Sequence, residues 1–369
     1  MSCCNALFDL AQPGVKQLVP YVPGKPIEEL ERELGLSHIV KLASNESPLG
    51  VSPKVLAAIG GALPDLTRYP DGSGFKLKAA IAQKYAVNEN QITLGNGSNE
   101  ILELVARTFL SPSLNTVFSQ HAFAVYPIVT QAAGASAHVV PARDYGHDLS
   151  AMLAAVDDKT RIVFIANPNN PTGTLLAPAD LQAFLRALPA TVVCVLDEAY
   201  FEFIAAEHKA DTISWLAEFP NLIVTRTFSK AYGLAGLRIG YGLSSPEIAD
   251  LLNRVRQPFN NNSLALIAAE TALHDAEYLT AAIAANNQGM SQLTAAFAEL
   301  GLEWIPSAGN FVAFNLKRPA MPAYEALLRR GVIVRPIGVY EMPDHLRVSI
   351  GTEQENAAFI DALKAVLDV

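Results

Sequence analysis

The sequence TRTFSKAYGLAGLRIG occupies residues 225–240 and directly follows an apolar run, Leu222 to Val224. It carries a lysine between small residues and, eight positions later across a glycine-rich segment, an arginine. A lysine amine can form a Schiff base with an aldehyde cofactor, and a cofactor phosphate needs a fixed cation with hydroxyl donors nearby. The side chains that would supply these groups are those of Lys230, Arg238, Thr227 and Ser229. A solvated surface loop would carry the same short pattern, so the rest of the chain must decide.

The composition is that of an ordinary globular chain. Its 369 residues are 50% hydrophobic and 17% charged, which predicts one large domain with a buried core and a smaller second domain. The net charge of -9, without a basic stripe, argues against a nucleic-acid partner. No apolar run approaches the roughly 20 residues of a membrane span, and the N-terminus does not have the pattern of an export signal. We therefore expect no nucleic acid and no membrane as partner.

The cysteines and histidines give no sign of a disulfide framework or a metal site. Cys3 and Cys4 lie at the N-terminus and Cys194 lies in an apolar run, so no CxxC pair is available. The seven histidines are scattered and form no HxxxH or HExxH pair. We expect no metal and a cytoplasmic location, where thiols stay reduced.

From residue 116 the chain alternates apolar runs with helical patterns. The runs predict strands at Thr116–Ser119, Ala137–Val140, Arg161–Ala166, Val192–Leu196 and Leu222–Val224. The helical patterns between them cover Val125–Ala133, Leu149–Val156 and Pro178–Leu188. Buried strands that alternate with helices predict a mostly parallel sheet covered by helices on both faces. In such a sheet the ligand site lies beyond the carboxyl ends of the strands.

Several chemically distinctive side chains follow predicted strands and should therefore meet at that edge. Asp197 ends an apolar run, where a carboxylate is costly unless it meets a cation such as a protonated pyridine nitrogen; a helix cap or an arginine partner would also satisfy it. Asn170 lies in the NPNNPTG turn at residues 167–173, whose prolines fix the backbone. The Asn170 amide and the Tyr200 hydroxyl could donate to one phenolate oxygen. Phe123 could stack on an aromatic cofactor or belong to the core.

A possible phosphate site precedes the helical pattern Ile101–Leu110. Residues 95–100, GNGSNE, place glycines, Ser98 and Asn99 at the start of that helix. Backbone N–H groups and the positive end of the helix dipole would gather there, which suits a phosphate. Ser98 or Asn99 could equally be an ordinary helix cap.

Two outer segments are less decisive. An N-terminal arm with prolines around Tyr21 precedes a helix at Ile27–Leu34, and the polar turn at residues 41–50, which contains Asn45, is either a linker or a substrate loop. In the C-terminal region we expect long helices, one at Glu247–Arg256 and one from Ser263 to about Ala285, and then an α+β unit. The strands and helices of that unit are predicted at Phe311–Leu316, Val332–Pro336 and His345–Ile350, and at Tyr324–Arg330 and Glu353–Leu367.

Arg335 and Arg347 both lie in apolar strands, where a cation needs an anionic partner. A structural salt bridge or a substrate carboxylate or phosphate would meet that need.

Taken together, the elements divide the chain into three parts. These are an N-terminal arm with part of the small domain (1–47), a large cofactor-binding domain (48–256), and an interdomain helix with the C-terminal small domain (257–369).

The joint set of motifs resembles a known family. NNPTG, DEAY and SK with an arginine eight residues on, at residues 169–173, 197–200 and 229–238, resemble the fold-type-I pyridoxal-phosphate (PLP) aminotransferases. The segments YVPG, KLASNESPLG, RYPDG, GNGSNE and LRVSIG are similar to those of the histidinol-phosphate aminotransferase family. The resemblance extends from about Tyr21 to Gly351, which makes it far more specific than any single motif.

This resemblance implies a role for each candidate residue. Lys230 would be the Schiff-base lysine, Asp197 the partner of the pyridine nitrogen, and Phe123 the ring that stacks on PLP. Asn170 and Tyr200 would donate to the ring oxygen of the cofactor. The residues that would hold the phosphate are Ser98, Asn99, Thr227, Ser229 and Arg238, completed across a homodimer by Tyr69 of the other chain. The residues that would bind substrate are Tyr21, Asn45, Arg335 and Arg347.

The resemblance implies a ping-pong aminotransferase of histidine biosynthesis. It would transfer an amino group between L-glutamate/2-oxoglutarate and imidazole-acetol phosphate/L-histidinol phosphate. Many relatives carry a tyrosine where this chain has Phe123, but a ring still stacks, so only a hydroxyl is lost. An aromatic (Phe/Tyr) aminotransferase is an alternative, because residues 120–126, QHAFAVY, resemble a subgroup for which that activity is plausible. A PLP-dependent phosphoamino-acid decarboxylase would share every cofactor residue. A PLP-sensing regulator would need a DNA-binding segment that this chain lacks.

Overall fold

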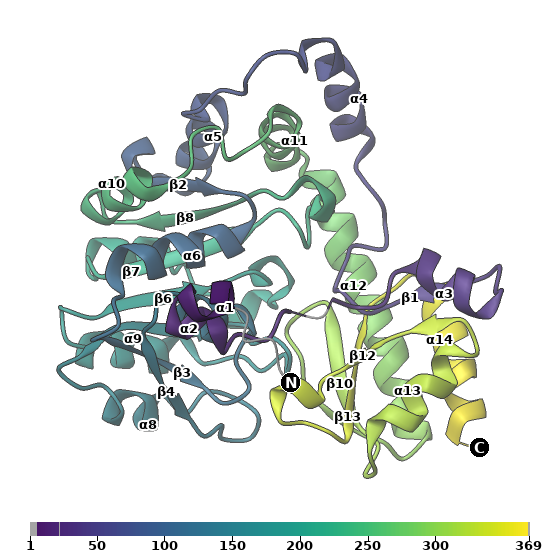
Figure 1. Cartoon of the computed structure of the whole chain (residues 1–369). Coiled ribbons are helices and arrows are strands. Elements are labelled where there is room, and N and C mark those ends of the chain that lie inside the picture. The colour runs from purple at the N-terminus through teal and green to yellow at the C-terminus, as the bar shows by residue number, and fades with distance from the viewer. Residues whose placement is uncertain (1–5, 22, 368–369) are drawn as a thin grey trace.

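The computed structural model describes residues 6–21 and 23–367, so Cys3 and Cys4 lie outside the described residues. The chain forms a large part and a small part, each built on its own sheet, with the helix α12 (Ala276–Glu299) running beside both (Figure 1). Within the described ranges, no helix combines the length and apolarity that crossing a bilayer demands.

The large part contains a seven-stranded sheet in the order β2-β8-β7-β6-β5-β3-β4. Its strands are β2 Ile92–Gly95, β3 Asn115–Ser119, β4 Ser136–Val140, β5 Thr160–Ala166, β6 Val193–Asp197, β7 Leu222–Thr227 and β8 Gly240–Ser244. Only β8 runs against its neighbours, and the other pairings in the sheet are parallel. The predicted mostly parallel sheet is therefore confirmed, and all five predicted strands are present.

The sequence analysis missed β8, the antiparallel strand between β2 and β7. Its sequence, GYGLS, is poor in the β-branched residues that indicate strands. A Cβ atom at Gly242 would lie 2.9 Å from the side chain of Ile101, so the glycine allows the helix behind the strand to approach closely.

Helices cover both faces of the large sheet. Along β6, Val193 and Val195 belong to one hydrophobic cluster, while Cys194 and Leu196 belong to another, because successive strand residues point to opposite faces. The first cluster is covered by α6 Ser98–Phe109, α7 Val125–Ala132 and α10 Pro246–Val255. The second is covered by α4 Pro53–Ala62, α5 Phe75–Tyr85, α8 Leu149–Ala154, α9 Pro178–Ala187 and α11 Ser263–Leu273.

The small part is an antiparallel sheet in the order β12-β13-β10-β9, with helices packed against it. Its elements are β9 Glu303–Ile305, β10 Phe311–Asn315, β12 Arg335–Pro336, β13 His345–Ser349, α13 Ala320–Leu328 and α14 Glu353–Leu367. The strand predicted over residues 332–336 is wrong as a single unit. It divides into β11 (Val332–Ile333) and β12, and β11 pairs instead with β1 (Val40–Lys41) from the N-terminal segment.

The single long helix predicted from Ser263 to about Ala285 is also wrong. Two helices, α11 and α12, meet at His274 and Asp275. The Asp275 carboxylate caps α12 by accepting from the backbone N–H of Tyr278, and it also accepts hydrogen bonds from Ser52 and Lys54. A side chain that caps a new helix and binds a distant segment favours a break there. By side-chain packing, α11 belongs with the large sheet, across the boundary predicted at residue 256.

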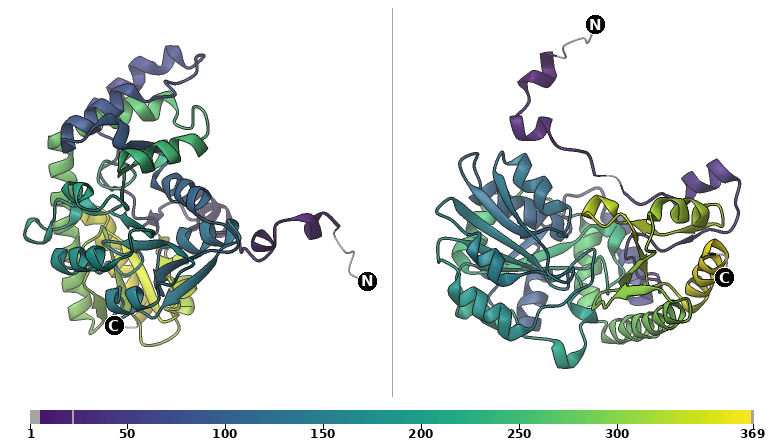
Figure 2. Two further views of the ribbon diagram at one scale, coloured as in Figure 1. Left: turned by 90° about the vertical axis from the view of Figure 1, so that its left-hand side faces the viewer. Right: turned by 90° about the horizontal axis from the view of Figure 1, so that it is seen from below.

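The N-terminal arm, with α1 (Ala6–Leu10) and α2 (Pro13–Lys16), projects away from both parts (Figure 2). Within the chain α2 contacts α7, but apolar side chains of the arm stay in solvent: Leu10 is 81% exposed and Val19 is 78% exposed. Beyond the arm, α3 (Ile27–Leu34) lies where the sequence predicts it.

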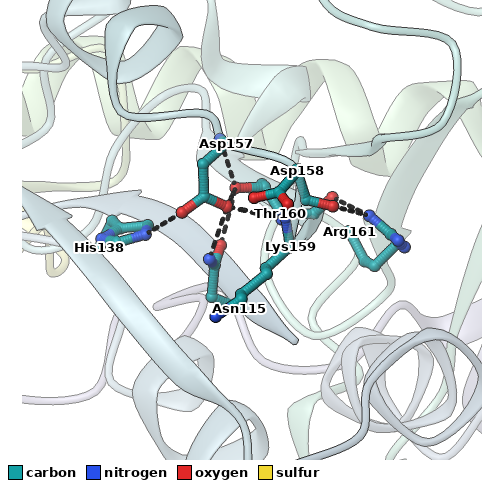
Figure 3. A network of polar contacts seen from close by, with 7 residues as sticks. All are labelled: Asn115, His138, Asp157, Asp158, Lys159, Thr160 and Arg161. Carbon is teal, nitrogen blue, oxygen red and sulfur yellow. Dashed lines mark hydrogen bonds and ion pairs between the residues drawn. The ribbon is translucent and has the colours of Figure 1, made fainter. Parts of the chain in front are cut away.

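A polar network ties together the amino ends of β3 and β5 and the edge strand β4 (Figure 3). The Asp157 carboxylate accepts hydrogen bonds from Asn115 Nδ2 (2.9 Å), His138 Nε2 (3.1 Å) and the Thr160 N–H (3.0 Å). These donors, led by Asn115, hold the pKa of Asp157 well below its usual range. The network lies at the end of the strands opposite their carboxyl ends.

We expect Asp157→Asn to lower the melting temperature by a few degrees at neutral pH and to leave turnover unchanged. A carboxyl whose pKa is depressed on folding stabilises the fold above its unfolded pKa of about 3.9, and that stability is lost as the pH falls below this value. Thermal denaturation at several pH values should therefore show the difference between variant and wild type shrinking in acid.

Asp158→Asn is the matched control, because Asp158 joins the network through its backbone carbonyl only. Equal effects of the two substitutions, or a difference that does not depend on pH, would refute this account of Asp157.

Candidate active site

A cavity of about 270 Å³ opens beyond the carboxyl ends of β5, β6 and β7 and is closed from the other side by the small part. Segments that follow these three strands line it together with residues of β12 and β13. Every site residue predicted from the sequence lines this cavity except Tyr69. They are Tyr21, Asn45, Ser98, Asn99, Phe123, Asn170, Asp197, Tyr200, Thr227, Ser229, Lys230, Arg238, Arg335 and Arg347.

Lys230 follows β7 and points into this cavity. Its Nζ donates to the Ser44 carbonyl oxygen at 3.1 Å. Burial lowers the pKa of Lys230 to about 8, and the nearby charges of Arg347 and Arg238 act in the same direction. A larger fraction of the amine is therefore neutral near physiological pH than for an ordinary lysine, and the neutral amine is the nucleophilic form.

Asp197 is buried at the end of β6. Its two carboxylate oxygens accept from the hydroxyls of Tyr126 (3.0 Å) and Thr225 (2.9 Å). Arg226, on the neighbouring strand β7, pairs with Glu198 at 2.8 Å. Burial raises the pKa of Asp197, because its partners among the described residues are neutral donors. A ligand cation on the cavity side, such as a pyridinium N–H, is what this carboxylate needs to remain ionised.

Sequence reasoning missed the two hydroxyls that hold Asp197. Thr225 is the direct partner of Asp197 in the β6–β7 pairing, so a strand register would have been needed to find it. Tyr126 reaches Asp197 from the first turn of α7 and stacks on Phe164, with ring centroids 4.7 Å apart. A tyrosine in a helix gives no sequence signal of such a contact.

Tyr200 and Asn170 approach the cavity as the sequence predicts. Tyr200 accepts a hydrogen bond from Asn45 Nδ2 at 2.9 Å, and burial raises the pKa of the Tyr200 phenol to about 12, so the hydroxyl keeps its proton. The Asn170 Oδ1 atom accepts from Arg347 at 2.6 Å. The turn around Asn170 is held by Asn169, which sequence reasoning missed and whose amide donates to the His121 carbonyl oxygen at 2.9 Å.

The groups predicted to bind a phosphate converge at the N-terminus of α6. Arg238 donates to Ser229 Oγ at 3.2 Å, and Thr227 Oγ1 donates to the same oxygen at 3.0 Å. Gly97, just before α6, has φ 77°, and a Cβ atom on it would lie 2.3 Å from the Arg238 guanidinium. A helix N-terminus, hydroxyl donors and a guanidinium kept close by a glycine fit a phosphate group.

Arg335 and Arg347 lie directly opposite each other in the β12–β13 pairing, and both line the cavity. Arg347 is buried and donates to the Ala43 carbonyl oxygen at 2.8 Å, while its Nε has no hydrogen-bond partner in the described part of the chain. Arg335 lies 5.5 Å from the centroid of the Tyr21 ring. Like charges directly opposite on a sheet repel, so this arrangement favours an anionic ligand between them.

Phe123 and Tyr69, two of the aromatic residues predicted to contact the cofactor, lie in different places. Phe123 lines the cavity and meets Tyr126 edge to face, with ring centroids 5.8 Å apart. Tyr69 lies outside the cavity of its own chain, is 82% exposed, and stacks on Phe259 at 4.8 Å.

Comparison with known proteins shows the family to which the chain belongs. Residues 37–363 match the family model of class I and II aminotransferases. The chain is 62% identical to histidinol-phosphate aminotransferase 2 of Pseudomonas fluorescens, over 97% of each chain, and 60% identical to its namesake of Methylococcus capsulatus, over 98% of this chain and 99% of that one.

Solved structures agree as well. The crystal structure of histidinol-phosphate aminotransferase from Sinorhizobium meliloti in complex with pyridoxal-5′-phosphate is 32% identical, covers 97% of both chains and superposes with a TM-score of 0.91. An aspartate aminotransferase of Thermus thermophilus, 22% identical, shares the fold with a TM-score of 0.84. The chain therefore belongs to the class I and II aminotransferase family.

Proposed function

We propose that this enzyme is a PLP-dependent histidinol-phosphate aminotransferase of histidine biosynthesis. It transfers the amino group of L-glutamate to imidazole-acetol phosphate, which gives 2-oxoglutarate and L-histidinol phosphate. Relatives of that name, at 60% identity or more over nearly the whole chain, support the reaction. The proposal includes a cytoplasmic location, which rests on the sequence composition alone.

The structural observation that carries the substrate class is the opposed pair Arg335 and Arg347. Glutamate has two carboxylates and histidinol phosphate has a phosphate with about two charges near neutral pH. Both therefore match two guanidinium groups better than phenylalanine, which offers a single carboxylate.

Lys230 and Asp197 have different roles in the proposed reaction. When bound, PLP supplies an aldehyde that joins amines covalently and a ring that takes up the electron pair released at Cα. Lys230 would hold the cofactor through its amine and, once released, would take the proton from the substrate Cα and pass it on during the transfer, a task for which its lowered pKa suits it. Asp197 keeps the proton on the pyridine nitrogen, so that the ring can accept charge.

The remaining side chains position the reacting groups. Tyr200 and Asn170 donate to the phenolate oxygen of the cofactor, and Phe123 packs on its ring. The phosphate is held by Arg238 and by the hydroxyls and backbone N–H groups at the start of α6. Arg238 at the phosphate and Asp197 at the ring nitrogen would hold the cofactor at two points and so orient it toward Lys230.

Turnover with a panel of amino donors tests the substrate. We expect kcat/KM with 2-oxoglutarate to be roughly 100-fold higher for histidinol phosphate than for phenylalanine or tyrosine, because one additional charge-assisted hydrogen-bonded contact contributes about 1.5–3 kcal/mol. Arg335→Ala should reduce turnover of histidinol phosphate more than turnover of phenylalanine. A preference for phenylalanine or tyrosine would instead support the aromatic aminotransferase, and release of CO₂ would support the decarboxylase.

We also propose that the enzyme is a homodimer whose active sites are shared between subunits. Tyr69 is exposed and lies outside the cavity of its own chain, which leaves it available to reach the phosphate site of a second copy. The apolar side chains of the N-terminal arm, among them Leu10 and Val19, would gain by packing on that copy. Two-fold symmetry would complete both sites at once.

Subunit exchange tests this arrangement. We expect Lys230→Ala and Tyr69→Ala, each impaired alone, to regain activity when mixed, because one hybrid site then carries both lesions and the other carries neither. Activity after exchange is the measurement. The control mixes Lys230→Ala with Asp197→Asn, two lesions of the same chain's cavity, and should show no recovery. If Tyr69 serves its own chain, the first mixture will not recover either.

A further inference from the structure

Asn45, which the sequence analysis assigns to substrate binding, is committed to hydrogen bonds within the protein. It is buried, and its φ of 53° turns the chain after β1 toward Tyr200. Its Nδ2 donates to the Tyr200 hydroxyl at 2.9 Å, and its Oδ1 accepts from Ser349 Oγ at 3.0 Å. The Asn45 backbone N–H donates to the same Ser349 oxygen at 2.8 Å. Ser349, the last residue of β13, therefore holds Asn45 at two points.

The direction of each hydrogen bond follows from the donors available. Because the Asn45 backbone N–H donates to Ser349 Oγ, the Ser349 hydroxyl proton is free to point at Oδ1 of Asn45. That bond fixes the amide with its NH₂ group toward Tyr200, and the Tyr200 oxygen is then an acceptor. The Tyr200 proton must therefore point elsewhere, and the cavity that Tyr200 lines is the open direction.

The same strand carries the anion-binding arginine. Arg347 and Ser349 are two positions apart on β13 and so share one face of the sheet. Arg347 donates to the Ala43 carbonyl oxygen, and the Ser349 backbone N–H donates to the Leu42 carbonyl oxygen at 2.9 Å. From within the small part, Asn310 Nδ2 donates to the Asn45 carbonyl oxygen at 3.0 Å. The segment 42–45 is thus held along β13.

We propose that Ser349 and Asn45 are positioning residues that orient the Tyr200 hydroxyl proton toward the cavity, where it meets the phenolate oxygen of the cofactor. The inference rests on the proposed function, since it needs PLP in this cavity with its ring oxygen at Tyr200. They act through Tyr200 and link it to the strand that carries Arg347.

Absorbance titration of the holoenzyme measures this directly. The absorbance of the bound cofactor changes with pH as the chromophore loses its proton, and the midpoint of that change is the pH at which half of it is deprotonated. A donor to the phenolate oxygen stabilises the anionic form, so loss of the donor raises the midpoint. We expect Ser349→Ala to raise this midpoint by about 0.5–1 unit, because a hydrogen bond contributes about 1 kcal/mol and one unit corresponds to about 1.4 kcal/mol. In Asn45→Asp both side-chain oxygens accept, so the Tyr200 proton turns away from the cavity and the midpoint should move at least as far.

The variants Ser349→Thr, Ser245→Ala and Tyr200→Phe make the test specific. Threonine keeps the hydroxyl and should restore the wild-type midpoint. Ser245 is a buried serine that caps α10 away from the cavity, so Ser245→Ala should lower thermal stability and leave the midpoint unchanged. In the Tyr200→Phe background, Ser349→Ala should have no further effect.

The outcomes distinguish the role of Tyr200 at the cofactor from the positioning role of Ser349 and Asn45. If Tyr200→Phe does not move the midpoint, the proposed role of Tyr200 at the cofactor fails. If Tyr200→Phe moves the midpoint but neither Ser349→Ala nor Asn45→Asp does, the positioning role fails and the proposed function stands. The same conclusion follows if Ser349→Ala shifts the midpoint equally with and without Tyr200. Should Ser349→Ala not fold, the nearly isosteric Asn45→Asp decides alone.

Discussion

The organisation of the active site depends on one buried carboxylate. Asp197 lies at the end of a central strand, where desolvation disfavours its charge, and its hydroxyl partners Tyr126 and Thr225 compensate only in part. The adjacent Glu198 pairs with Arg226 at 2.8 Å. Among the described residues the hydrogen-bond partners of Asp197 are neutral donors, so a ligand cation beside it would keep it ionised, and the cofactor ring nitrogen has the required chemistry.

Cations surround the rest of the cavity, and both parts of the molecule contribute them. Lys230 and Arg238 follow β7 of the large sheet, while Arg335 and Arg347 come from the small sheet. On the proposed assignment, the large part supplies the covalent partner and the phosphate site, and the small part supplies a second anion site facing them. A cofactor and an anionic substrate that bind together neutralise charges that would otherwise repel one another.

Much of this arrangement could be predicted from the sequence, because buried parallel strands place the residues that follow them along one edge. That rule is enough to bring Asp197, Asn170 and Lys230 together. The same rule does not predict contacts that depend on strand register. Arg335 lies opposite Arg347 because β12 pairs with β13. The sequence predicts one strand over residues 332–336 and does not show that this segment divides between two sheets. The family resemblance implied substrate binding for Asn45, whereas in the structure its side-chain amide is hydrogen-bonded to Tyr200 and Ser349, contacts that the sequence does not reveal.

The central claim is that Lys230 is the residue that binds the cofactor covalently in this cavity. The most direct measurement is reduction of the purified PLP-loaded enzyme with borohydride, followed by digestion and mass mapping of the modified peptide. The account predicts a pyridoxyl label on Lys230, and no label at this site in Lys230→Ala. A stoichiometric label on any other lysine, or none on Lys230 in an enzyme that turns over histidinol phosphate, would contradict it.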